Sequence, residues 1–169
     1  MKKNRIIPAA SLAVLAAFLA CISAPVMAQT SGIVIQDVKM QLFLERTGTL
    51  SENIVGVKKT FFNTVLGQGD AGEPADAVLV TLIFQGPKNS KGSDKIARDL
   101  AQVKVTQHAK TGPRTLLNRV YGGFLFGENG LAHKAFLIDN ATCSPLEIEA
   151  KLGRSRKQVK IDFKCDEIR

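Results

Sequence analysis

Two cysteines near the C-terminal end are the residues of this chain best suited to forming a covalent link. Cys143 stands before an alternating run of apolar and charged residues, and Cys165 ends a second run of this kind. Because the N-terminal segment indicates export, the pair predicts a Cys143–Cys165 disulfide. A metal site or a catalytic thiol is the alternative, but no histidine stands near enough in the sequence to complete a ligand set.

Three carboxylates, Asp70, Glu73 and Asp76, lie close together in a glycine-rich stretch. Carboxylate oxygens on a loop are ligands that Ca²⁺ prefers. The spacing of an EF-hand loop is absent, so an ordinary solvated loop is the favoured interpretation and a calcium site is the alternative. No other cofactor is indicated.

His108 and His133 are the only histidines of the sequence. A hydrolytic enzyme would have to bring one of them to the carboxylates of Asp70, Glu73 or Asp76. The chain contains neither Gly-x-Ser-x-Gly nor His-Glu-x-x-His, the motifs of common hydrolases. We therefore favour a non-enzymatic protein and keep the hydrolase as an alternative.

Basic side chains gather in two predicted turns. Arg154, Arg156 and Lys157 lie in one, and Lys88 and Lys91 lie in the other. Turns of this kind at one end of a domain attract phospholipid headgroups, lipopolysaccharide or an acidic protein. Solvated turns whose charges only maintain solubility are the alternative. Nucleic acid is not expected as a partner, because no aromatic residues are interleaved with these cations.

The N-terminus has the pattern of a secretory signal peptide. Basic residues precede an apolar run over residues 11–22, and Val26-Met27-Ala28 fits a signal-peptidase site. Cleavage there removes residues 1–28 and leaves residues 29–169 as one domain, with 20 basic and 15 acidic residues and a net charge of +5. The run is too short to predict a transmembrane span. Acylation of Cys21 is the alternative form of processing. The predicted location is periplasmic or extracellular, in a bacterium.

Alternation of apolar and polar residues predicts strands along most of the domain, and a nearly continuous apolar run predicts a central strand, covered on both faces, at residues 77–85. They cover residues 33–45, 77–85, 101–109, 116–126, 131–138, 146–152 and 159–165. Residues 51–66 fit either a helix capped by Ser51 or Asn53 or, preferably, a short strand from Thr60 to Leu66. About seven to eight strands predict an all-β fold, an antiparallel β-sandwich of immunoglobulin-like or C2-like general architecture. A closed barrel is the alternative.

Turn signals predict two hairpins. Asn129-Gly130 predicts that residues 116–126 pair with residues 131–138. The polar stretch 153–157 predicts that residues 146–152 pair with residues 159–165, with Leu152 opposite Val159. In that register the disulfide closes the open end of the final hairpin and holds the C-terminus.

These observations favour a binding or accessory domain of the cell envelope that engages an envelope protein or an anionic surface. Tyr121 and residues 124–126 and 136–138 are apolar on both faces of their strands. This pattern indicates either burial on both sides or a surface for a partner. A structural subunit that pairs through apolar strands is therefore the second hypothesis.

Overall fold

The computed structural model describes residues 32–57, 74–87 and 99–163, and these residues contain eight strands and no helix. The strands are β1 Val34–Leu44, β2 Thr49–Leu50, β3 Ala75–Gln85, β4 Ala101–Ala109, β5 Gly112–Tyr121, β6 Leu131–Ile138, β7 Leu146–Leu152 and β8 Ser155–Ile161. The all-β prediction is therefore confirmed, and the number of strands agrees with it.

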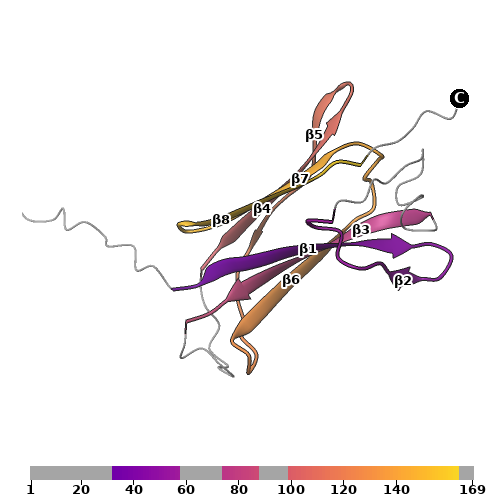
Figure 1. The fold of residues 1–169 in the computed structure, drawn as a ribbon. Helices are drawn as coiled ribbons and strands as arrows, with labels where there is room; N and C mark the ends of the chain where they lie inside the picture. The colour runs from indigo at the N-terminus through magenta and orange to yellow at the C-terminus, as the bar shows by residue number, and fades with distance from the viewer. Residues whose placement is uncertain (1–31, 58–73, 88–98, 164–169) are drawn as a thin grey trace, which may run out of the picture.

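The strands form two four-stranded sheets that lie one over the other (Figure 1). Sheet I has the order β2-β1-β3-β6, and sheet II has the order β5-β4-β7-β8. Every pair of neighbouring strands is antiparallel. This arrangement is consistent with the predicted β-sandwich.

The core lies between the two sheets because every second residue of the long strands is apolar. Sheet I directs Val38, Met40 and Leu42 of β1 inward, together with alternate residues of β3. Sheet II directs Val103 and Val105 of β4 inward, together with alternate residues of β7. Burial of each such side chain stabilises the fold by about 1.5–3 kcal/mol.

Side-chain oxygens close the outer edge of β1. The amides of Met40 and Leu42 donate to Asn53 Oδ1 and Ser51 Oγ, both at 2.9 Å. Towards its N-terminal end, the amide of Val38 donates to the carboxylate of Asp37 at 2.8 Å, and that of Ile35 donates to Ser155 Oγ at 2.9 Å. These contacts occupy backbone groups that another strand would otherwise pair with.

Residues 51–57 form no helix, and Ser51 and Asn53 accept amides of β1 instead of capping a helix. A helix beginning at either residue is therefore wrong. The predicted strand from Thr60 to Leu66 lies outside the described residues.

The final hairpin is confirmed, but its predicted register is wrong. Leu152 pairs with Ser155 and Ile148 pairs with Val159, so Gly153 and Arg154 alone form the turn. Gly153 has a φ of 54°, a left-handed conformation that glycine adopts without steric cost. The prediction placed the turn over residues 153–157 and so displaced the pairing by an even number of residues. The displacement preserves the faces of both strands, which is why alternation alone did not reveal it.

The other predicted hairpin is wrong. Strand β5 pairs with β4 in sheet II, whereas β6 pairs with β3 in sheet I. Between Tyr121 and Leu131 the chain crosses from one sheet to the other. Asn129 does lie in a tight turn, in which its Oδ1 accepts the Leu131 amide at 3.0 Å. An Asn-Gly pair thus identifies a local turn without identifying the partner of the strand that follows it.

Candidate functional site: a basic sheet face

The two sheets differ strongly in charge. Residues 101–121 and 146–161, which build sheet II, contain nine basic and two acidic residues, a net charge of +7. Residues 34–50, 75–85 and 131–138, which build sheet I, contain three of each sign. An excess positive potential therefore surrounds sheet II.

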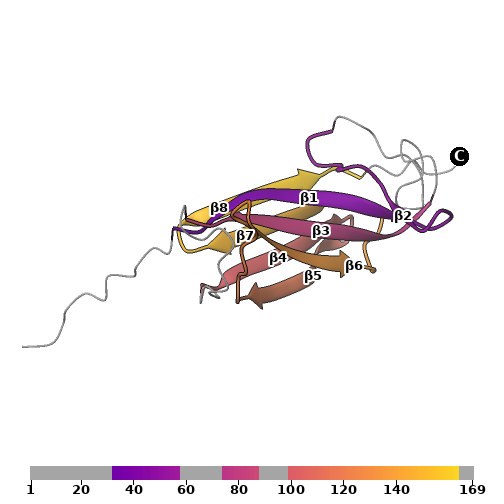
Figure 2. The same ribbon diagram turned by 90° about the horizontal axis from the view of Figure 1, so that it is seen from below.

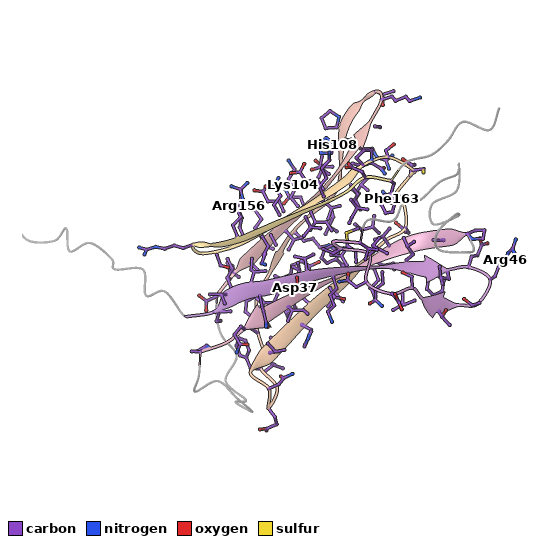
Figure 3. The ribbon with its side chains drawn as sticks, viewed as in Figure 1. Asp37, Arg46, Lys104, His108, Arg156 and Phe163 are labelled. Carbon is purple, nitrogen blue, oxygen red and sulfur yellow. The ribbon has the colours of Figure 1, made fainter. Side chains whose placement is uncertain are left out.

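The outer face of sheet II, here called the basic face, presents alternate residues of its strands. Figure 3 shows Lys104, His108 and Arg156 along this sheet, on the side away from sheet I. Its charged members are Lys104 and His108 of β4, Glu147, Glu149 and Lys151 of β7, and Arg156 and Lys160 of β8. The side chains of Lys151, Arg156 and Lys160 are 49, 58 and 57% exposed, so a partner can reach these cations.

The two glutamates of the basic face are held by the groups around them. His108 Nε2 lies 2.8 Å from Glu147 Oε2, and Gln158 donates to the other oxygen of Glu147. The hydrogen bonds from His108 and then from Gln158 lower the pKa of Glu147 below its ordinary value of 4.5. Both groups stabilise the charged carboxylate, so Glu147 remains an anion at neutral pH.

Glu149 is bound by two cations. Its Oε1 lies 3.0 Å from Lys151 Nζ and also pairs with the guanidinium of Arg156. The hydrogen bond from Lys151 is the main cause that lowers the pKa of Glu149. The pair of Glu149 with Arg156 joins β7 to β8 and is a cross-strand charge pair on the solvent-exposed face of the hairpin.

Several cations keep their charge uncompensated. Lys104, Arg119, Arg154 and Lys157 form no ion pair with any residue that the structure describes. Lys104 belongs to the basic face, Arg154 to the β7–β8 turn, Lys157 to β8 opposite Ala150, and Arg119 to the edge strand β5. These four side chains are the ones most available to an anionic partner.

The basic residues predicted in this turn are exposed to solvent, and the serine among them is attached to sheet I. Arg154, Arg156 and Lys157 are all exposed to solvent. Ser155 between them accepts the Ile35 amide, which attaches the turn to the first strand of sheet I. The second predicted cluster, Lys88 and Lys91, lies outside the described residues.

The predicted metal ligands Asp70 and Glu73 also lie outside the described part of the chain, and Asp76 falls within β3. Among the described residues, no three His, Cys, Asp or Glu side chains lie close enough together to hold a metal ion. The two histidines lie on different sheets, because His108 belongs to β4 and His133 to β6.

A buried glutamine fixes the corner that carries Cys143. Gln107 is 1% exposed and extends from the inner face of β4. Its Nε2 donates to the Thr142 carbonyl at 2.5 Å, and its Oε1 accepts from the Thr142 amide and hydroxyl at 3.2 and 3.0 Å. Cys143 packs partly against the core beside this network, whereas Cys165 lies outside the described residues.

Alternation in the sequence is a signal for part of this site. Lys104 and His108 alternate with the apolar residues of their strand, and Glu147 and Glu149 alternate with those of theirs, as residues of a solvent-exposed face do. Alternation does not show that β4 pairs with β7, the pairing that sets Lys104 opposite Glu149. A scan against protein-family models finds no match, and a search of the curated proteins finds none either. In the described parts of the chain no helix is long and apolar enough to cross a membrane.

Proposed function

We propose that this protein is an exported, non-enzymatic binding module of the bacterial cell envelope that engages an anionic partner through sheet II. The observation that carries the proposal is the net charge of +7 on the strands and turns of that sheet, against zero on sheet I. A basic sheet with unpaired cations raises the local concentration of anions and speeds their association.

The uncompensated cations give the proposal a direct test. We expect the double variant Lys104→Glu/Lys157→Glu to bind immobilised polyglutamate or anionic phospholipid vesicles roughly tenfold or more weakly than wild type. The matched control is Lys39→Glu/Arg46→Glu, which makes the same change in net charge on sheet I. Wild-type binding should weaken as salt rises. Equal losses in the two double variants would show that total charge, and not sheet II, governs binding.

A second candidate function is assembly through the outer face of sheet I. Leu50 and Leu137, paired with Phe43 and Leu79 respectively, are 43 and 55% exposed. Exposed apolar side chains on one sheet face are a feature of subunit contacts. Light scattering of the mature domain tests this candidate, because a monomer at high concentration counts against it.

We also propose that a Cys143–Cys165 disulfide completes the domain, whose finer resemblance to immunoglobulin-like or C2-like architecture stays a prediction. Phe163, only 2% exposed, belongs to the core against which Cys143 packs, and one residue separates it from Cys165 in the chain. Removal of residues 1–28 during export would leave these as the only two cysteines. The intact mass of the exported protein should therefore show cleavage after Ala28 and two hydrogens fewer than the reduced chain. A mass that includes both hydrogens would exclude the disulfide.

A further inference from the structure

The edge of sheet II at β5 is open, unlike the other long sheet edges of the described residues. Among the described strands, β5 pairs only with β4, and it lies at the border of the sandwich (Figure 2). Side-chain oxygens close the β1 edge, and β8 packs beside β1 through the bond from the Ile35 amide to Ser155. Lys134 of β6 donates from Nζ to the Gly123 carbonyl at 3.0 Å. This bond holds the segment between β5 and β6 against the β6 edge.

The alternation of the ladder identifies the free backbone groups of β5. The His108 amide donates to the Pro145 carbonyl on the β7 side, so even-numbered residues of β4 face β7 and odd-numbered ones face β5. Residues of β5 opposite the even-numbered positions therefore direct their backbone groups away from the sheet. These residues are Pro113, Thr115, Asn118 and Val120. Since proline has no amide hydrogen, the open stretch begins at Thr115.

The side chains along this stretch define what would fit beside it. Arg114 and Arg119 lie opposite Gln107 and Val103, so both arginines are on the side of the sheet that faces sheet I. The guanidinium of Arg114 donates to the Asn140 carbonyl at 2.6 Å and retains further donors, while Arg119 has no ion pair among the described residues. On the opposite side, Val120 is 61% exposed.

We propose that β5 accepts an extended acidic peptide segment of a partner protein as an additional strand of sheet II. This inference rests on the proposed function and names the partner of the same basic sheet. The added strand would pair with the outward backbone groups of Thr115, Asn118 and Val120. Arg114 and Arg119 are five residues apart on β5, but a register shift of the ladder between Val105 and Thr106 keeps them opposite Gln107 and Val103, which are four residues apart on β4. On an added strand that follows the spacing of β4, acidic side chains at positions i and i+4 would face the two arginines. An apolar side chain would cover Val120.

A peptide suits this surface better than a membrane does. The exposed basic stretch from Gly153 to Lys157 contains no apolar residue that could enter a bilayer. Glu147 and Glu149 lie among the cations of the basic face and would repel lipid phosphates. An open strand edge, in contrast, presents a row of backbone donors and acceptors whose spacing matches another extended chain.

The test uses the mature protein and a fluorescent peptide about as long as β5, with alternating threonine and valine and with glutamate at i and i+4. Two further versions carry N-methyl groups on alternate amides, one on the odd and one on the even positions. These peptides have the same charge, but only one leaves the amides that face β5 free. We expect one methylated version to bind like the parent peptide and the other to bind roughly tenfold or more weakly.

A protein variant provides the second measurement. Asn118→Pro removes an outward amide from an edge position that tolerates proline, so it should weaken binding of the parent peptide by a similar factor without changing the circular dichroism spectrum. The matched control, Asn118→Ala, keeps the amide and should bind like wild type.

Three results would overturn strand addition: equal binding of both methylated peptides, equal binding by the two Asn118 variants, or binding of anionic vesicles without binding of the peptide. The proposed function fails separately. It would survive the first two results if binding remained sensitive to salt and to Lys104→Glu/Lys157→Glu, and it would survive the third as recognition of a lipid surface.

Discussion

The outer faces of the two sheets share one core but present different chemistry to solvent. On sheet I, Ala77 and Ile83 are 2 and 7% exposed although they point away from the core, and Leu137 beside them on β6 is 55% exposed. On sheet II the equivalent positions include Lys104, opposite Glu149. The same alternation along the strands therefore encodes two surfaces, one largely apolar and one charged.

The edges of the sheets differ as well. The β1 edge of sheet I is closed by side-chain oxygens of Ser51, Asn53, Asp37 and Ser155, whereas the β5 edge of sheet II has no such covering among the described residues. Closing an edge prevents unwanted strand pairing, and leaving one open permits it. This difference between the β1 and β5 edges is the observation from which the addition of a partner strand to sheet II is proposed.

The largest effects on stability should come from core substitutions. They should be similar in the two sheets, because the sheets share one core and differ on their outer faces and edges. Leu82→Ala in sheet I and Ile148→Ala in sheet II both remove side chains with no exposed surface, so each should lower the free energy of unfolding by about 2–5 kcal/mol. The control Leu137→Ala, on the outer face, should change it by no more than about 0.5 kcal/mol. Urea denaturation measures all three. A large difference between the two core variants would mean that the sheets contribute unequally to the core.

Intermediate effects should separate the closed edge from the open one. Asn53→Ala leaves the Met40 amide without its acceptor, which should cost about 1–3 kcal/mol and increase self-association. The corresponding change on the open edge, Asn118→Ala, should cost about 0.5 kcal/mol or less. Denaturation and light scattering measure the two effects. If the variants were equally stable, the oxygen of Asn53 would not be what closes β1.

The smallest effect concerns the charge pairs of sheet II. The pKa of Glu147 is lowered in the folded protein, so its stabilising contribution is present above pH 4.5 and is lost as the pH falls through the folded-state pKa. Glu147→Gln should therefore reduce stability by about 0.2–1 kcal/mol at neutral pH, and the difference from wild type should disappear in acid. His108→Gln should lose most of the same stabilisation, because the hydrogen bond from His108 is the largest cause of the lowered pKa of Glu147. Unfolding midpoints measured across acidic pH test this prediction. A stability difference between wild type and Glu147→Gln that persists in acid would contradict it.

Most of the strands were predictable because each combines strict alternation with burial of one face. The alternation of residues 101–109 puts Val103, Val105 and Gln107 on one face and Lys104 and His108 on the other, and the structure buries the first three. The partner of Gln107 was not predictable, because its bonds to Thr142 join segments far apart in the sequence. A glutamine among valines was nevertheless a signal, since a buried amide requires hydrogen-bond partners.

Strand pairing was less predictable than strand identity. The pattern fixes which face of a strand is buried, but any even displacement leaves that face unchanged, so Leu152 could be placed opposite either Val159 or Ser155. The basic face was predictable only in part for the same reason. Its residues were individually visible as wet positions, but their common sheet depends on the pairing of β4 with β7.

The hydrogen bond from the Ile35 amide to Ser155 Oγ limits how early in synthesis the domain can finish folding. The two residues are 120 positions apart, and they join the first strand to the last. During synthesis, the edge of β1 near Ile35 must wait for nearly the whole domain before it is complete. A chain that crosses a membrane from its N-terminus would thus carry this edge unpaired until its final hairpin emerges.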